Sequence, residues 1–225
     1  MYYFKKKIDA FTLAEVLITL GVIGVVAAMT MPTLIQNNQE KVTVTRLKKV
    51  YSVLSQAYIS ASSENINIQE WGLGEEFSKD GAQAIADKML PYLKISKNCG
   101  FETGCFPKNG IYKYFSGEGW YTIDSSSRAY RFILADGTLV AIESYGTQGK
   151  IFVDINGFKG PNQDGKDLFS FWLKTEGVVP FGTSNGSPVF GTRESFTAWV
   201  IFNENMDYLR CPDKLGWDKA KSCKD

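Results

Sequence analysis

Hydrophobic positions form one unbroken run near the N terminus and then change to a periodic pattern. The run covers residues 11–31 (FTLAEVLITLGVIGVVAAMTM) and contains one charged side chain, that of Glu15. A helix of about twenty apolar residues is long enough to cross the hydrocarbon core of a bilayer. The run therefore predicts a membrane-spanning helix. A carboxylate inside such a helix is costly, so we expect Glu15 to have a functional partner.

A helical pattern resumes after Pro32. Apolar residues recur there at three- and four-residue steps, which is the period of one helix face. This stripe consists of Val44, Leu47, Tyr51, Leu54, Tyr58 and Ala61. We expect one long helix from about Thr12 to about Ser62. Its first half is apolar all round, and its second half should cover a sheet with one face.

The rest of the chain favours short strands with turns between them. The predicted strands are Ile111–Phe115, Trp120–Asp124, Tyr130–Leu134, Leu139–Glu143, Lys150–Asp154 and a last one at Phe169–Leu173. Asp136-Gly137 is a hairpin turn signal between two of them. Gly81–Leu90 is predicted as a short helix that ends at Pro91. Residues 196–209 are ambiguous, because TAWVIF favours a strand and NENMDYL a turn or a helix. The pattern as a whole predicts the α+β class.

Composition and the absence of known motifs argue against several classes of function. The 225 residues carry a net charge of +1 and include no His, so imidazole catalysis and His metal sites are excluded. Roughly 190 residues follow the apolar run, which suits one soluble domain. The balanced charge gives no sign of a nucleic-acid interface. No nucleophile elbow, P-loop or dinucleotide fingerprint appears, so we do not expect an enzyme.

The charge pattern predicts that the domain lies outside the cytoplasm, where its cysteines can form disulfides. Lys5, Lys6 and Lys7 precede the apolar run, and the positive-inside rule keeps that end cytoplasmic. The compartment beyond the membrane permits disulfides. The four cysteines lie in two close pairs, Cys99/Cys105 and Cys211/Cys223, without a C-x-x-C spacing. Local pairing is the simplest of the three connectivities that four cysteines allow.

The N terminus combines a basic leader (MYYFKKKIDA), a small residue at its end, the sequence FTLAE and an apolar helix. This combination resembles the N terminus of type IV prepilins and type II secretion pseudopilins. The resemblance implies cleavage between Ala10 and Phe11 by prepilin peptidase, methylation of the new N terminus, and an assembly role for Glu15. Pro32 matches a proline that ends or kinks such helices. The family usually has Gly before the cut, where this chain has Ala10.

A signal peptide and a plain signal anchor both fit the apolar run less well. A Sec signal peptide has a shorter apolar core and an A-x-A-like site after it, whereas Ala27-Ala28-Met29 matches that site poorly. A plain signal anchor accounts for the apolar run and the lysines, but it gives no reason for Glu15.

The resemblance also implies a pilin-like fold, in which a long N-terminal helix packs on an antiparallel sheet with a C-terminal disulfide loop. Residues 1–10 would be the leader, 11–32 the transmembrane and filament-core helix, and 33–225 the extracytoplasmic domain. The implied partners are other pilin subunits, prepilin peptidase, the inner-membrane assembly platform and membrane lipid. The chain would first be a single-pass inner-membrane protein and then part of a filament. A minor, adhesive or DNA-uptake tip subunit, or a bitopic binding module, are alternatives.

One loop, DINGFKGPNQDGKD (residues 154–167), could bind calcium. Its oxygen-bearing side chains belong to Asp154, Asn156, Asn162, Asp164 and Asp167. Calcium takes six to eight oxygen ligands, and a glycine-rich backbone can turn tightly around it. The spacing does not match an EF-hand, and the same residue types favour turns without any metal. Some pseudopilins, which this chain resembles, bind calcium in their C-terminal half. Both interpretations stay open from the sequence.

Overall fold

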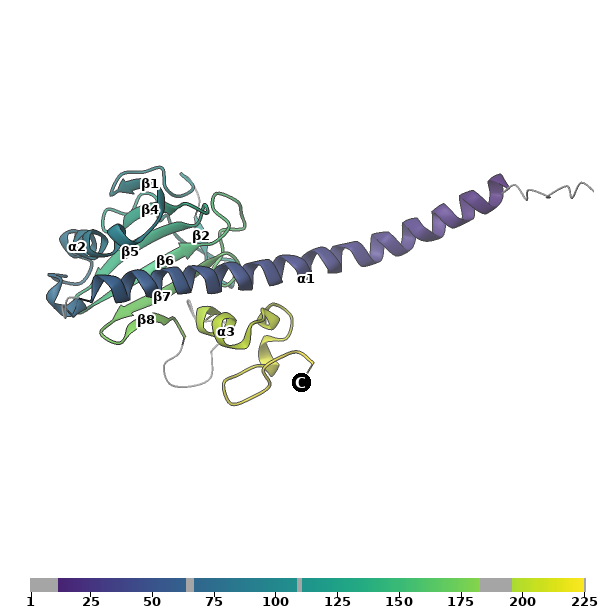
Figure 1. Cartoon of the computed structure of the whole chain (residues 1–225). Helices are drawn as coiled ribbons and strands as arrows, with labels where there is room; N and C mark the ends of the chain where they lie inside the picture. The colour runs from purple at the N-terminus through teal and green to yellow at the C-terminus, as the bar shows by residue number, and fades with distance from the viewer. Residues whose placement is uncertain (1–11, 64–66, 109–110, 183–195, 225) are drawn as a thin grey trace, which may run out of the picture. The chain divides into compact units, whose positions relative to one another are not determined.

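The computed structural model describes residues 12–63, 67–108, 111–182 and 196–224. The chain divides into two compact units, Met1–Lys41 and Val42–Asp225. A single helix, α1 (Leu13–Ala61), contributes to both, and it begins and ends within one residue of the predicted bounds. The second unit contains the sheet (Figure 1).

The second half of α1 packs on the sheet with one face, as the stripe predicts. Val44, Leu47, Leu54, Tyr58 and Ala61 are buried. They join the larger of two hydrophobic cores, together with side chains from α2 and the strands. Figure 1 shows α2 (Lys79–Met89) lying across the same sheet. A Ser side chain caps α2, since Ser78 Oγ accepts a hydrogen bond from Gly81 N at 3.2 Å.

The main sheet has six antiparallel strands in the order β1-β4-β5-β6-β7-β8. Its strands are β1 (Ile95–Gly100), β4 (Tyr130–Leu134), β5 (Leu139–Tyr145), β6 (Gln148–Asp154), β7 (Leu168–Lys174) and β8 (Gly177–Pro180). Thr138 N donates to Asp136 Oδ1 in the β4–β5 hairpin, and Gly137 takes a φ of +87°. The predicted α+β fold, a long helix on an antiparallel sheet, is confirmed.

A smaller core fills the other face of the sheet. Leu139, Ala141, Phe152 and Leu168 contribute to it from β5, β6 and the start of β7. Cys105, Phe106, Tyr112, Ile123 and Ala129 cover them from the segment between β1 and β4, which includes the two-stranded sheet β2 (Tyr112–Lys113) and β3 (Gly119–Tyr121). Strands buried on both faces have nearly continuous apolar runs, which accounts for YRFIL in β4.

Several predicted elements differ from the structure. TAWVIF, which favours a strand by its sequence, lies in a helix, α3 (Phe196–Asn203), and is buried over most of its length. The predicted strands Ile111–Phe115 and Trp120–Asp124 shorten to the two-stranded sheet. Two strands were not predicted, β1 and β8, which lie at the two edges of the main sheet. β8 (GVVP) is only four residues long and β1 (ISKNCG) is mostly polar, so neither has a strand pattern that is easy to recognise.

Candidate functional site

The first half of α1 has the properties of a membrane-spanning helix. An 18-residue window has a mean hydropathy of 2.2, and none of it is buried. In the part of the chain that the structure describes, α1 is the one helix that is long and apolar enough to cross a bilayer. Its large apolar side chains, Leu17 and Ile23 among them, are exposed. A helix that is apolar all round requires a membrane or protein neighbours around it.

Glu15 and Thr12 form a capping box at the start of this helix. Glu15 N donates to Thr12 Oγ1 at 3.2 Å, while Thr12 N and Thr12 Oγ1 donate to Glu15 Oε2 at 2.8 and 2.9 Å. The pattern T-x-x-E satisfies amides that would otherwise lack partners at the helix start. Both hydrogen bonds that Thr12 donates to the carboxylate are accepted by the same oxygen, Oε2.

Pro32 lies inside α1, which continues to Ala61. The resemblance implies that this proline ends or kinks the helix, and in the structure the helix does not end there. A proline nitrogen carries no hydrogen, and the carbonyl four residues earlier loses its helical donor. The predicted processing residues, Ala10 and Phe11, lie outside the described residues.

The β6–β7 loop brings two aspartates together in the interior. Asp154 and Asp167 are 0% and 2% exposed. Tyr112 Oη donates to Asp154 Oδ2 at 2.6 Å, and Asn156 N donates to Asp154 Oδ1 at 3.1 Å. Asn156 also links the two carboxyl groups, because its Nδ2 donates to Asp167 Oδ2 at 3.1 Å.

Backbone amides hold the second carboxyl group. Asn162 N and Gln163 N donate to the two oxygens of Asp167 at 2.8 and 2.7 Å. The Oδ1 atoms of Asn156 and Asn162 are buried without a hydrogen-bond partner. The loop therefore combines one Asx turn, at Asp154, with backbone amides that donate to Asp167, and it also contains two unsatisfied amide oxygens. These oxygens and the carboxylates are donor atoms of the kind that calcium prefers.

Burial controls the ionisation of this pair. Desolvation raises the pKa of Asp154 from its ordinary value of 3.8 to about 8. The bond from Tyr112 opposes this shift, and the charge of Asp167 adds to it. Burial also raises the pKa of Asp167, against the bonds from Gln163 and Asn162. Without a cation nearby, the pair is expected to hold a proton at neutral pH.

The third predicted aspartate of this loop, Asp164, is held through its main chain. Its side chain is buried, and its backbone N donates to Lys113 O at 2.9 Å. Among the residues that the structure describes, no group of three or more His, Cys, Asp or Glu side chains could hold a metal ion. Calcium binding by this loop stays a prediction.

The structure contains two disulfides, Cys99–Cys105 and Cys211–Cys223, with Cα atoms 6.0 and 5.9 Å apart. Two side chains of these sites were not recognised in the sequence, Thr12 and Tyr112. The T-x-x-E pattern was a local signal for Thr12. Tyr112 contacts a residue 42 positions away, and no local pattern reports such a contact.

Comparison with known proteins gives two matches. Residues 5–31 match the prokaryotic N-terminal methylation motif, which supports the resemblance to type IV pilins and pseudopilins. Residues 33–178, more than half of the chain, match the family of unknown function DUF6613. The chain matches no curated protein and no solved structure. The chain thus belongs to the DUF6613 family and carries a pilin-type N terminus.

Proposed function

We propose that this protein is a structural subunit of a type IV pilus or a type II secretion pseudopilus. Prepilin peptidase would remove the leader between Ala10 and Phe11, and the chain would wait in the bacterial inner membrane with its second unit outside the cytoplasm. The assembly platform would then move it into a helical filament. The motif match at residues 5–31 and the exposed apolar half of α1 support this proposal.

The observation that carries the proposal is the position of Glu15. Its carboxylate lies in the first turn of an apolar helix, four residues after the proposed new N terminus at Phe11. The capping box occupies Oε2. The carboxylate can still accept a further donor, because each oxygen has two lone pairs.

The amino group of a neighbouring subunit is the partner that this site fits. Both charges would be costly in an apolar filament core, and pairing them offsets part of the desolvation free energy. Removing one partner leaves the other charge buried alone. A pairing between the Glu15 of one subunit and the Phe11 of the next is head-to-tail. Such contacts produce an open filament when the rotation does not close a ring.

Two variants separate the assembly role of Glu15 from its capping role. Glu15→Gln removes the negative charge, whereas Thr12→Ala removes the capping hydroxyl and keeps the charge. Losing a cap costs about 1 kcal/mol of helix stability. We expect Glu15→Gln to insert into the membrane but to be missing from sheared filaments, and Thr12→Ala to be incorporated. Immunoblots of the membrane and filament fractions measure both. Normal incorporation of Glu15→Gln would refute the role in assembly.

A crosslinking pull-down of the membrane form would identify the machine. Recovery with pilus components or with secretion components would separate the two proposed systems. Few copies per filament would favour a minor or tip subunit, and an uncleaved leader would favour a bitopic protein.

A further inference from the structure

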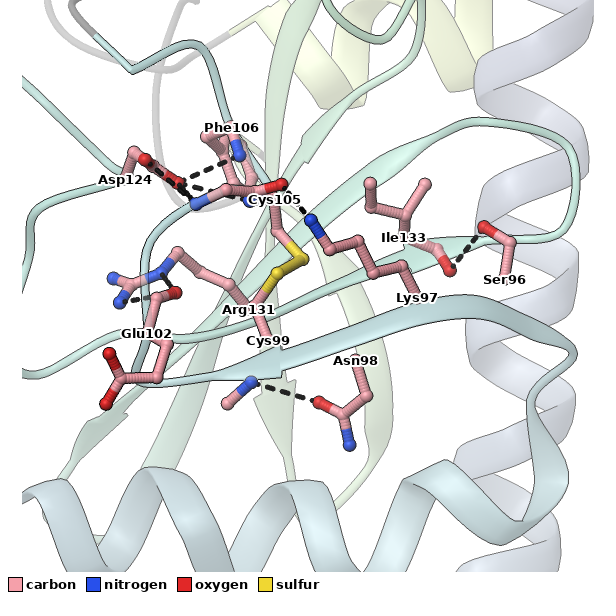
Figure 2. Close-up of a disulfide and its surroundings, with 12 residues drawn as sticks. Ser96, Lys97, Asn98, Cys99, Glu102, Cys105, Phe106, Asp124, Arg131 and Ile133 are labelled. Atoms are coloured by element: carbon pink, nitrogen blue, oxygen red, sulfur yellow. Dashed lines mark hydrogen bonds between the residues drawn. A yellow bond between two sulfur atoms is a disulfide. The ribbon is translucent and has the colours of Figure 1, made fainter.

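One buried carboxylate holds the loop that the Cys99–Cys105 disulfide closes. The Asp124 side chain is 1% exposed and accepts hydrogen bonds from three consecutive backbone amides (Figure 2). Gly104 N lies 2.8 Å from Oδ1 and 3.0 Å from Oδ2, while Cys105 N and Phe106 N lie 3.2 and 3.0 Å from Oδ1. Hydrogen bonds to an ionised group are stronger than neutral ones.

A buried guanidinium holds the carbonyl side of the same loop. Arg131, on β4, is 1% exposed. Its Nη2 donates to the Phe101 carbonyl. Its Nε and Nη2 each lie 3.4 Å from the Glu102 carbonyl oxygen (Figure 2). Its Nη1 donates to the carbonyls of Ile123 and Ser126 at 3.0 and 2.6 Å. One side chain therefore ties the disulfide loop to the segment that carries the buried carboxylate.

None of these bonds involves a sulfur atom. All of them join Asp124 or Arg131 to main-chain groups, so their donors and acceptors are the same whether the two cysteines are reduced or oxidised. A further main-chain bond, from Glu102 N to Cys99 O at 2.9 Å, closes the turn after the first cysteine. Gly104, with a φ of +106°, supplies a backbone conformation that other residues rarely adopt. These hydrogen bonds hold the loop closed alongside the disulfide.

We propose that Asp124 and Arg131 close this loop before its disulfide forms, and that they are positioning residues for the oxidation of Cys99 and Cys105. In that step the two thiols lose two protons and two electrons, and a bond forms between their Sγ atoms. A disulfide oxidant accepts the protons and electrons and becomes two thiols. A loop that is already closed raises the effective concentration of one thiol at the other, which favours the disulfide.

The second disulfide loop provides an internal control. Cys223 N donates to Asp207 Oδ2 at 2.7 Å, and Arg210 pairs with the other oxygen of Asp207. In each loop, the backbone amide of the second cysteine thus donates a hydrogen bond to an aspartate side chain. A loss of positioning at one loop should leave the other loop unchanged.

Thiol–disulfide equilibrium tests the proposal on the full-length chain in detergent. The reduced protein is equilibrated with glutathione buffers, free thiols are trapped by alkylation, and each cysteine pair is quantified by peptide mass spectrometry. We expect Asp124→Asn to lower the effective concentration of the Cys99–Cys105 pair about tenfold or more, since charge-assisted bonds are lost. The Cys211–Cys223 pair should not change.

Two further variants serve as controls. Asp207→Asn should lower the second pair alone. Glu102→Gln removes an exposed carboxylate from the first loop and should alter neither pair. A wild-type value for Cys99–Cys105 in Asp124→Asn would overturn the proposal. So would an equal loss at both pairs in this variant, which would indicate general unfolding.

Hydrogen exchange gives a second, independent measurement. In the double variant Cys99→Ser/Cys105→Ser, the amides at positions 104 to 106 should stay protected, because they still donate to Asp124. Adding Asp124→Asn should remove this protection. If these amides exchange at the rate of an open chain in the double variant, the loop does not close without its disulfide and the proposal fails.

Discussion

At the residue scale, Asp154 makes the stability of the protein depend on pH. Its pKa in the folded state is about 8, against an ordinary value of 3.8, so the folded protein binds more protons than the unfolded chain between about pH 4 and pH 8. We expect the free energy of unfolding to fall as pH rises through this window, by at most about 1.4 kcal/mol per pH unit for one group. Urea unfolding at several pH values measures this slope.

Asp154→Asn is the control for this prediction. The amide has the shape of the protonated carboxyl group, its oxygen can accept the Tyr112 bond, and it does not titrate. The variant should therefore lose most of the slope between pH 5 and pH 8. Equal slopes in the variant and the natural protein would assign the pH dependence to other groups.

Calcium offers a second prediction about the same loop. If the ion binds at Asp154, Asp167 and the unsatisfied oxygens of Asn156 and Asn162, it should raise the melting temperature by an amount that grows with calcium concentration. The shift should be larger at pH 8 than at pH 6, because calcium competes with the proton. Magnesium should do less, since it needs a tighter shell.

Melting curves in EDTA and in millimolar calcium decide this question. Equal melting temperatures would favour hydrogen-bonded turns as the whole role of the loop. A calcium shift that survives Asp154→Ala together with Asp167→Ala would place the ion elsewhere.

The interactions of single side chains could be predicted only where the partners are close in the sequence. The run of Asp, Asn and Gly at residues 154–167 indicated the loop in which Asp154 and Asp167 meet, since all its side-chain oxygens lie within fourteen residues. The bond from Tyr112 could not be predicted, because it depends on how β2 is placed against β6. The same holds for Asp124, whose carboxylate reaches amides about twenty residues earlier. Buried polar partners of this kind follow from tertiary packing.

At the element scale, the second half of α1 depends on its buried face. Leu47 is 0% exposed, and Leu47→Ala should lower the free energy of unfolding by about 2–5 kcal/mol because it removes buried methyl groups and leaves a cavity. Ile59, on the same helix, is 67% exposed, and Ile59→Ala should change stability by about 0.5 kcal/mol or less. Urea midpoints of the two variants measure the difference. Similar losses would contradict the packing of this face on the sheet.

Elements with a long or strongly apolar pattern were predictable, and short or exposed ones were not. α1 and β4 have the predicted bounds within one residue. α3 was ambiguous because a short apolar run has no period that separates a buried helix from a buried strand. β1 (ISKNCG) lies at the edge of the sheet, where three of its residues are exposed and three are half-buried, so its sequence has no continuous or alternating apolar pattern.

At the scale of the whole molecule, one matched region corresponds to the apolar N-terminal segment and the other to the segment that forms most of the sheet. Residues 5–31 match the methylation motif, and the described part of this region contains the start of the exposed, apolar half of α1. Residues 33–178 contain most of the sheet. The pilin-type N terminus indicates a structural protein that assembles with other subunits. It also fits anchoring in a membrane before assembly.

Processing at the N terminus tests this account most directly. The full-length protein is purified from the membranes of cells with and without prepilin peptidase, and its N terminus is determined by intact mass and sequencing. We predict a chain that begins at Phe11 in the first case and at Met1 in the second. An uncut chain in both cases, or a cut after Ala28 by signal peptidase, would contradict the proposal that this protein is a processed pilin subunit.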